Sequence, residues 1–228
     1  MFDRLELLIG KESLNKIKEK NVVVLGLGGV GGFVVESLIR SGIENITVID
    51  NDKIDITNLN RQIIATKESI GNNKTDEIEK RILSINKNVK IEKINSFIDE
   101  TNIDKIFSKK IDYFIDACDT INTKKLVIKK CIENNIKFIT CLGTGKRLNP
   151  EKLTICDLRK TKNDPIARIL RKYIKDENIN KKVLCCYSEE EPVKTEGKTI
   201  PSSIFVPSSA GILIASYIIR DIIKNKKL

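Results

Sequence analysis

The chain has 228 residues, a formal net charge of +10, six cysteines and no histidine. This length suits one domain, which can bury a large apolar core without disulfide or metal support. The absence of histidine excludes Ser-His-Asp and Cys-His hydrolases, histidine-ligated zinc sites and dehydrogenases that use a histidine base.

The cysteines are scattered along the chain, and none belongs to a CxxC pair. This usage indicates reduced core thiols. With no secretory leader and no apolar run of about 18 residues, we expect a cytoplasmic protein without membrane association. The excess of lysine and arginine has two interpretations, a solvated basic surface or a polyanionic partner such as RNA.

The hydrophobic pattern predicts alternating strands and helices. Residues 2–20 have helical spacing broken by Gly10, which predicts a short helical arm followed by a second short helix. The predicted strands are residues 22–25, 45–49, 89–94, 113–117 and 137–142. The predicted helices between them are residues 33–41, 69–86 and 123–134. Such alternation favours an α/β fold with a Rossmann-like, mostly parallel sheet and flanking helices.

After Gly145 the pattern loosens and predicts a smaller C-terminal extension of strands and helices. A strand is expected at 153–157, and an amphipathic helix at 165–175 is opened by Asp164 and a proline. The prolines and mixed charge of 184–209 are typical of a loop flanked by strand fragments.

Residues 208–223 predict an apolar helix that we expect to be too short, and too polar at its ends, to span a membrane. We expect a single domain, residues 1–228, in three parts. These are an arm at 1–20, a Rossmann-like core at 21–145 and an extension at 146–228.

A glycine-rich turn lies between the first core strand and its helix, and an acid ends the second strand. In G-x-G-x-x-G, the first glycine allows the tight turn and the second lets a phosphate approach the backbone. The third lets the helix pack close to the strand. The helix N-terminus adds amides and a positive dipole end. We predict a nucleotide cradle formed by Gly26, Gly28, Gly29, Gly31 and Asp50.

Downstream polar residues discriminate among nucleotides. Arg61 and Lys74 supply two cations, and Asp116 and Asp119 follow a buried strand at its carboxyl end, where α/β sites form. Two cations and a carboxylate that can hold Mg²⁺ suit a triphosphate better than the diphosphate of NAD. The alternative is that Arg61 and Lys74 are surface charges and that Asp119 is a turn residue. Predicted ATP contacts are Asp52, Asn58, Arg61, Gln62, Lys74 and Asp116.

These pieces resemble the ThiF/MoeB/HesA group of adenylating enzymes, which are related to ubiquitin activators. That group combines GxGGxG, an aspartate ending the second strand, N-x-x-R-Q, a downstream lysine and D-x-x-D, and all five stand in this chain. The resemblance implies that Asp50 binds ribose, that Arg61 and Lys74 hold the phosphates, and that Asp119 ligates Mg²⁺. It also implies a homodimer in which Arg4 reaches the partner's ATP site.

The reaction implied by this resemblance is attack of a substrate carboxylate on the α-phosphate of ATP, giving an acyl-adenylate and pyrophosphate. Catalysis of this kind depends on positioning and charge neutralisation more than on a general base, which suits a chain without histidine.

Within that group, residues 157–175 and 200–223 resemble the tRNA threonylcarbamoyladenosine dehydratases. Such enzymes use ATP to activate the threonyl carboxylate of the modified adenosine beside the anticodon. The carbamoyl nitrogen then closes a cyclic product and AMP is released. The resemblance implies ATP and Mg²⁺ as cofactors, modified tRNA as substrate and a sulfur-transfer protein as a candidate partner.

Two other functions stay open. The first is activation of the C-terminus of a ubiquitin-like sulfur-carrier protein, although the CxxC pairs of the zinc-bearing members are absent. The second is a nucleotide-binding regulatory module without chemistry, which would be expected to have lost Arg61, Lys74 or Asp119.

A basic stripe in the helix predicted at 165–175 gives independent support for a tRNA substrate. Its cations recur at i, i+3, i+4 and i+7, and we expect Ile166, Ile169, Leu170, Tyr173 and Ile174 to fill the other face. The stripe is either a phosphate-binding surface or a merely solvated face. The candidate tRNA contacts are Lys160, Arg168, Arg171, Lys172 and Lys175.

Overall fold

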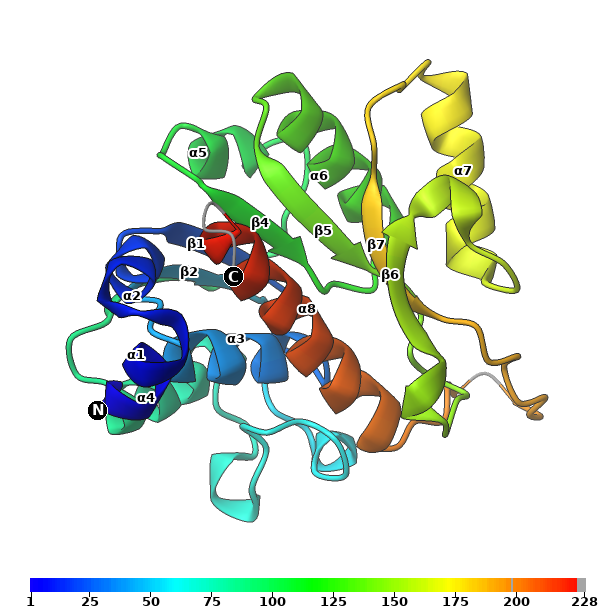
Figure 1. Cartoon of the computed structure of the whole chain (residues 1–228). Helices are drawn as coiled ribbons and strands as arrows, with labels where there is room; N and C mark the ends of the chain where they lie inside the picture. The colour runs from blue at the N-terminus through cyan, green and yellow to red at the C-terminus, as the bar shows by residue number, and fades with distance from the viewer. Residues whose placement is uncertain (198, 225–228) are drawn as a thin grey trace.

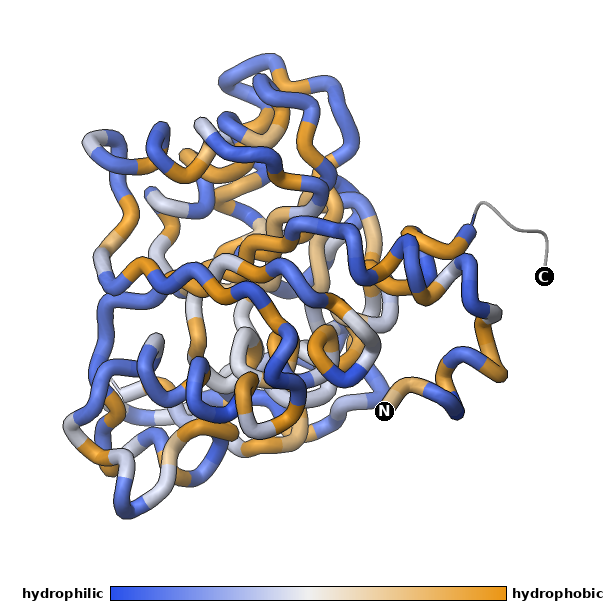
Figure 2. The backbone as a smooth tube through the Cα atoms, turned by 90° about the vertical axis from the view of Figure 1, so that its left-hand side faces the viewer, coloured by the Kyte–Doolittle hydropathy of each residue, from blue (hydrophilic) through white to orange (hydrophobic). Residues whose placement is uncertain are grey.

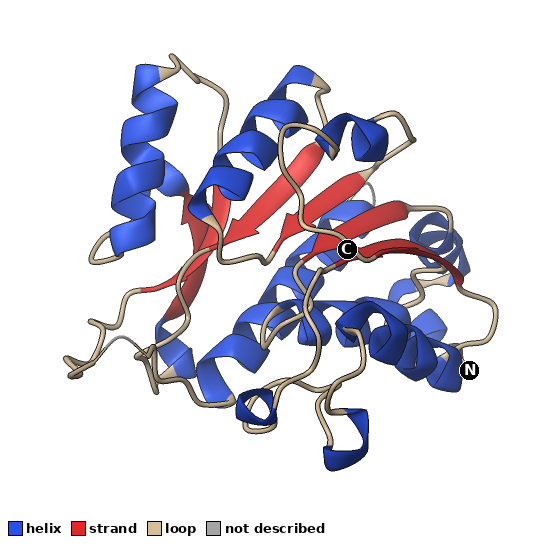
Figure 3. Ribbon diagram, turned by 180° about the vertical axis from the view of Figure 1, so that it is seen from behind, coloured by secondary structure: helices blue, strands red, loops and turns tan. Residues whose placement is uncertain are grey.

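At the centre of the computed structural model, which describes residues 1–197 and 199–224, lies one seven-stranded sheet in the order β3-β2-β1-β4-β5-β7-β6. Neighbouring strands are parallel except for β6 and β7. The predicted α/β fold with a mostly parallel sheet and flanking helices is confirmed (Figure 3). The strands are β1 Asn21–Leu25, β2 Asn45–Ile49, β3 Lys90–Ile94, β4 Tyr113–Asp116, β5 Lys137–Cys141, β6 Leu153–Asp157 and β7 Leu184–Ser188.

Helices cover both faces of this sheet (Figure 1). The helices are α1 Asp3–Ile9, α2 Lys11–Lys18, α3 Gly31–Arg40, α4 Lys74–Ile85, α5 Ile103–Phe107, α6 Ile121–Glu133, α7 Pro165–Asp176 and α8 Phe205–Ile223. Short 3₁₀ turns are η1 Ile56–Asn58, η2 Lys67–Ser69, η3 Pro150–Lys152 and η4 Leu158–Lys160. The five-residue α5 has no counterpart among the predicted helices, because one turn and a half is too short for a helical period to show.

Two apolar layers hold the helices to the sheet. Val22 and Val24 of β1 face the layer that contains α2, α3, α4 and α8, whereas Val23 and Leu25 face the layer under α5 and α6. A strand buried on both faces reads as a continuous apolar run, which is why the sequence predicted β1. In Figure 2 the hydrophobic residues lie mainly within the body, and the N-terminal arm lies at its edge.

The chain crosses from β1 to β2 through α3 and from β4 to β5 through α6, on opposite faces of the sheet (Figure 1). The crossovers therefore diverge between the neighbouring strands β1 and β4, which pair from Val22–Tyr113 to Leu25–Asp116. In open α/β sheets a crevice forms outside the carboxyl ends of the strands at such a point.

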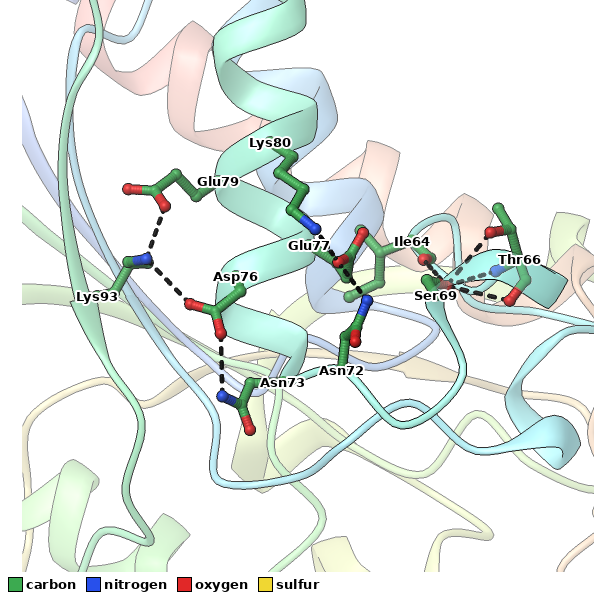
Figure 4. Close-up of polar contacts among 10 residues, drawn as sticks. All are labelled: Ile64, Thr66, Ser69, Asn72, Asn73, Asp76, Glu77, Glu79, Lys80 and Lys93. Carbon is green, nitrogen blue, oxygen red and sulfur yellow. Dashed lines mark hydrogen bonds and ion pairs between the residues drawn. The ribbon is translucent and has the colours of Figure 1, made fainter.

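The helix predicted at 69–86 begins only at Lys74. Ser69 belongs to its own 3₁₀ turn, where its hydroxyl accepts a hydrogen bond from the amide three residues earlier (2.8 Å), and Gly71 has φ +88°. The first turn of α4 is then tied to β3, because Lys93 binds Asp76 at 2.9 Å and Glu79 at 2.6 Å (Figure 4). The late start places Lys74 at the first position of the helix.

The strands of the C-terminal extension join the same sheet, and α8 returns to pack on α3. α8 starts three residues earlier than expected and spans 19 residues. It is long and apolar enough to cross a membrane, so the expectation that it is too short is wrong. Half of its 18-residue apolar window is buried inside the protein, against α3 and the sheet.

The crossing of α3 and α8 depends on Gly211. A Cβ at that position would lie 2.5 Å from the Val30 carbonyl oxygen and 2.8 Å from Phe33 Cβ. At the far end of α8, the Asp221 carboxylate accepts hydrogen bonds from Tyr113 Oη and Lys137 Nζ, each at 2.7 Å. α8 is therefore held against both a helix and the sheet.

We expect Gly211→Ala to destabilise the protein by about 1–3 kcal/mol, because the added methyl must push α8 away from α3. This corresponds to a loss of about 2–4 °C in Tm per kcal/mol in a chain of this size. Differential scanning calorimetry measures it, with Ser216→Ala on the exposed face of the same helix as the control. A rise in Tm, as helix propensity alone would produce, would contradict the close contact.

Candidate active site

A cavity of about 630 Å³ opens at the carboxyl ends of β1 and β4. Of the nucleotide and metal contacts predicted within this chain, all but Gly31 and Asp116 line it. The lining includes Gly26, Gly28, Gly29, Asp50, Asp52, Asn58, Arg61, Gln62, Lys74 and Asp119. Residues that lie far apart in the sequence are therefore brought together as predicted.

The glycine turn follows β1 with almost no space for side chains on its inner side. Gly26 has φ +89°, and a Cβ there would lie 2.8 Å from the backbone of Ala117 and Cys118. A Cβ on Gly31 would lie 1.7 Å from the Gly26 carbonyl oxygen, so α3 starts directly against the turn. At Gly28, by contrast, the nearest described atom within 4 Å is a Gln62 side-chain nitrogen at 3.8 Å, which leaves its backbone open to the cavity.

No described side chain caps the first turn of α3, which begins at Gly31 beside this turn. The Gly32 amide donates to the Gly28 carbonyl oxygen at 3.1 Å, and the positive dipole end of the helix is suited to an anion. The turn therefore has the geometry of a phosphate cradle.

Asp50 lies at the end of β2 with its carboxylate almost fully buried. Its Oδ2 accepts a hydrogen bond from the Leu27 amide at 2.6 Å, and its Oδ1 accepts one from the Asp52 amide at 2.9 Å. Burial raises the pKa of Asp50, although the nearby Lys74 ammonium and the two amides oppose the rise. Burial makes the ionised form of this acid unfavourable in free energy. An acid in this state at a cavity wall is typical of a binding site rather than of a stabilising contact.

Two cations face the cavity. The Lys74 ammonium is buried and donates to Asp52 Oδ2 at 2.7 Å, and it lies 3.8 Å from Asp50 Oδ1. Arg61 donates through Nη1 to the Thr57 carbonyl oxygen at 2.7 Å and to the Asn60 side chain at 3.0 Å. An incoming phosphate would compete with the exposed Asp52 for Lys74.

Some buried polar side-chain atoms have no hydrogen-bond partner among the described residues. They include the side-chain oxygen of Gln62, a lining residue of the cavity, and the Ser203 hydroxyl, next to the lining residue Ser202. Asn58 is better satisfied, because its side-chain oxygen accepts from the Asp55 amide at 3.1 Å and caps η1. Buried polar groups are rarely left unpaired, so the free Gln62 oxygen indicates that a ligand or water completes the site.

The two acids at the carboxyl end of β4, Asp116 as its last residue and Asp119 in the loop after it, lie in different environments. Asp119 is exposed and lines the cavity, whereas the Asp116 side chain is fully buried below it. Asp116 accepts hydrogen bonds from Thr140 Oγ1 at 2.6 Å and from Lys124 Nζ at 3.1 Å. The structure therefore does not place Asp116 where it was predicted to contact ATP, because its carboxylate holds β4 to β5 and α6 instead.

Lys124 was not singled out from the sequence. Burial alone would lower its pKa, but the Asp116 carboxylate raises the pKa above the usual lysine range. A signal existed, because Lys124 shares the apolar face of α6 with Val127, Ile128 and Cys131, where an unpaired charge would be costly.

Other residues that line the cavity belong to none of the sequence motifs that predicted the site. Phe97, 48% exposed, follows β3 on the Asp50 side of the cavity. Thr144 in the loop after β5, Ser202 before α8 and Pro207 in the first turn of α8 also line the cavity. The aromatic side chain of Phe97 in a polar loop could have marked it in the sequence as a site residue. Nothing in the sequence marks Thr144, Ser202 or Pro207 in the same way.

Within residues 1–197 and 199–224, no group of three or more histidine, cysteine or acidic side chains is arranged to hold a metal ion. The donor set at Asp119 nevertheless fits Mg²⁺, which proteins commonly hold through one or two carboxylates together with substrate phosphates and water.

The basic stripe predicted in α7 is only partly exposed. Arg168, Lys172 and Lys175 are exposed, and Lys172 lies 4.0 Å from Asp176. Arg171 is half-buried and donates to the Thr161 carbonyl oxygen at 2.9 Å, so it holds the segment before α7.

Three further placements complete the predicted set. Lys160 is exposed at the end of η4. Ile169, expected on the apolar face of α7, is 39% exposed, and the buried face consists of Ala167, Leu170 and Ile174. Arg4 is exposed on α1 and does not line the cavity of its own chain.

The fold and the cavity are those of a nucleotide-binding α/β protein, and the cavity combines a glycine turn at a helix N-terminus, a buried acid and two cations. A family model described as the ThiF family matches residues 2–224, and the chain belongs to this family.

Within this family, the chain is similar to proteins of one particular name. The chain is 36% identical to the tRNA threonylcarbamoyladenosine dehydratase of Bacillus subtilis, over 98% of this chain and 95% of that protein. Crystal structures of the Escherichia coli tRNA N6-threonylcarbamoyladenosine dehydratase TcdA in complex with AMP and with ATP match with TM-scores of 0.93 and 0.92. Each is 30% identical and covers 98% of this chain and 94% of the E. coli chain.

We expect Asp50→Asn to weaken ATP binding at least tenfold without lowering stability at pH 7. The pKa of Asp50 is higher in the folded state than its unfolded value of 3.8, so ionisation of Asp50 lowers the free energy of unfolding at pH 7. As the pH falls through the folded pKa toward 3.8, Asp50 takes up a proton and this loss of stability disappears. The asparagine cannot ionise, so the variant's Tm should equal or exceed the parent's at pH 7, with the difference closing toward pH 4. Titration calorimetry with ATP and thermal melts at pH 4–8 test both parts, and a clear drop in Tm at pH 7 would refute the second.

Proposed function

We propose that this chain is an ATP-dependent tRNA threonylcarbamoyladenosine dehydratase. It would adenylate the threonyl carboxylate of threonylcarbamoyladenosine beside the anticodon and cyclise it, with release of pyrophosphate and AMP. The observation that carries the proposal is the similarity of the chain, over almost its whole length, to enzymes of this name. The cavity supports it, because glycines, acids and cations suited to adenylation line it.

The cavity suggests a role for each residue. Asp50 would accept the ribose hydroxyls, and the glycine turn with the α3 N-terminus would bind phosphate oxygens. Arg61 and Lys74 would neutralise the charge that develops on the phosphates, with Lys74 exchanging its Asp52 partner for a phosphate.

Asp119 would hold Mg²⁺ at the mouth of the cavity. When bound, the ion would screen the triphosphate charge and make pyrophosphate a better leaving group.

Two bond exchanges would complete the reaction. A carboxylate oxygen of the substrate bonds to the α-phosphorus and pyrophosphate leaves. The carbamoyl nitrogen then bonds to the activated acyl carbon, loses its proton and expels AMP, which closes the ring. Both nucleophiles belong to the substrate, so the protein acts by positioning and electrostatics.

We also propose a homodimer in which Arg4 approaches the partner's ATP site. α1, all of whose residues are described, buries none of them and leaves Leu7 89% and Leu8 76% exposed. Apolar side chains this open are more easily explained if a second subunit covers them. The division into arm, core and extension, the cytoplasmic location and a sulfur-transfer partner remain predictions from the sequence and the family resemblance.

The alternative is a ThiF/MoeB-type adenylyltransferase that activates the C-terminus of a ubiquitin-like sulfur-carrier protein. It would use the same cavity, so only the second substrate separates the two functions. A basic surface on α7 favours a polyanionic substrate.

Incubation of the protein with ATP, Mg²⁺ and tRNA tests the function. We expect pyrophosphate release with tRNA that carries threonylcarbamoyladenosine and none with unmodified tRNA, together with conversion of the open nucleoside to a product lighter by one water in mass spectrometry. Equal turnover with unmodified tRNA, or none with either, would refute the proposal. Chelation of Mg²⁺ should stop release.

Asp119→Ala should lower pyrophosphate release at least 100-fold, because the carboxylate would be the protein's ligand to Mg²⁺. Its Tm should stay near the parent value, since the side chain is exposed and the one hydrogen bond that it accepts from a described residue, from Thr120 Oγ1, is 3.5 Å long. Glu133→Ala, an exposed acid at the far end of α6, is the control. Retained activity in Asp119→Ala would exclude this metal assignment.

The double substitution Arg168→Ala/Lys175→Ala should weaken tRNA binding while leaving ATP affinity unchanged. Each lost phosphate contact should also reduce the slope of log K against log salt by about 1. Filter binding at several salt concentrations measures both. Lys87→Ala/Lys90→Ala, which removes two exposed lysines at the other edge of the sheet, should change neither quantity. Equal losses in the two double variants would mean that α7 is only a solvated face.

A further inference from the structure

A buried arginine stands directly behind the cavity wall formed after β5. Arg147 and Asp164 form an ion pair at 3.3 Å in which the side chains are 2% and 0% exposed. Neither residue lines the cavity, and no sequence motif pointed to either as a partner of the other. A pair so fully desolvated is weak evidence for stability, because apolar residues could replace it at little cost.

Arg147 joins three segments through its guanidinium group. Nη1 donates to the Gly143 carbonyl oxygen, Nε donates to the Glu190 carbonyl oxygen at 3.1 Å, and Nη2 contacts Asp164. A planar fork of five N–H donors can satisfy three such partners at once, which a lysine cannot do.

One of the three segments, residues 143–147, carries part of the cavity wall at Thr144. A second segment follows β7, where the Glu190 carboxylate accepts hydrogen bonds from the Leu148 and Asn149 amides at 3.1 and 2.9 Å. The Lys146 amide also donates to the Pro201 carbonyl oxygen at 2.8 Å, next to Ser202 in the same wall. Arg147 thus fixes the loop that carries Thr144 to the segment after β7, and the backbone of that same loop binds Pro201 beside Ser202.

The third segment is the start of α7. Asp164 is the N-cap of this helix, and its Oδ1 accepts a hydrogen bond from the Ala167 amide at 2.8 Å. One carboxylate therefore caps the helix with one oxygen and binds Arg147 with the other. Arg168, the first exposed cation of the helix, donates its amide to the Asp164 carbonyl oxygen at 3.1 Å.

Thr144, in the loop after β5, lies across the sheet order from Asp50 and Phe97, whereas Ser202 accepts a hydrogen bond from Asn60 through its carbonyl oxygen at 2.9 Å. Asp50 and Phe97 lie toward β2 and β3, and the glycine turn lies at β1. With the ribose at Asp50 and the phosphates at the turn, the acceptor carboxylate has to approach from the β4 and β5 side.

We propose that Arg147, paired with Asp164, is a positioning residue that holds the substrate-side wall of the active site and links it to the tRNA-facing helix α7. The inference rests on the proposed function for its substrate. The pair acts on the position of the modified nucleoside and not on ATP binding.

Arg147→Lys tests the proposal, because it keeps the charge and removes the fork. We expect kcat with threonylcarbamoyladenosine-modified tRNA to fall at least tenfold, with the Kd for ATP within twofold of the parent. Asp164→Asn, which can still cap α7, should give a fall in the same direction. The rates are normalised to the fraction of protein that binds ATP, so that partial unfolding of a variant does not lower its measured kcat.

Arg159→Lys is a matched control. Arg159 also binds an aspartate, Asp157 at 3.3 Å, and the backbone carbonyl oxygens of Ile179 and Lys181, but it touches no cavity loop. Its replacement should leave kcat unchanged. A parent-like kcat in Arg147→Lys, or a loss of ATP affinity in parallel with kcat, would overturn the proposal.

Hydrogen exchange separates failure of this inference from failure of the proposed function. Arg147→Lys should speed amide exchange in residues 143–149 and 189–193 and leave the glycine turn at the parent rate. If the parent does not turn over modified tRNA, the proposed function fails, and the exchange result still decides whether Arg147 holds the wall. Uniform exchange changes in both regions would refute it.

Discussion

The structure depends on one constraint, the absence of side chains where the glycine turn meets β4. A Cβ on Gly26 would lie 2.8 Å from the backbone of Ala117, and one on Gly31 would collide with Gly26 itself. Because these positions have no side chains, α3 starts directly against the turn, with its N-terminus beside the crevice between β1 and β4. Every polar residue of the cavity is arranged around that opening.

The C-terminal extension completes the cavity by returning to the same turn. A Cβ on Gly29 would lie 3.1 Å from Pro207 at the start of α8, and Asn60 binds the Ser202 carbonyl oxygen at 2.9 Å. The packing of α8 on α3 through Gly211 therefore also determines where Pro207 lies at the cavity.

Two buried ion pairs support the site from behind. Asp116 and Lys124 hold β4, β5 and α6 together below Asp119, and Arg147 and Asp164 hold the loop after β5 to α7. Buried charges are costly and contribute little net stability, but each constrains the directions of its partners. One pair lies next to Asp119 in the chain and the other behind the loop that carries Thr144, and adenylation at this cavity would require fixed geometry at both places.

By itself the sequence determined the α/β class, most strands and helices, the glycine cradle and the acids and cations that line the cavity, because these depend on local periodicity and on motif spacing along one crossover unit. Only the tertiary structure showed that Asp116 turns away from the cavity, that α4 begins at Lys74 and that Arg171 binds Thr161. The wall at Thr144 and Ser202 and the Arg147–Asp164 pair were also beyond sequence reasoning. The physical reason is the same in each case. The burial of a side chain and its hydrogen-bond partners depend on segments that are distant in sequence and meet only in the assembled sheet. A local sequence pattern therefore cannot show which carboxylate pairs with a buried cation.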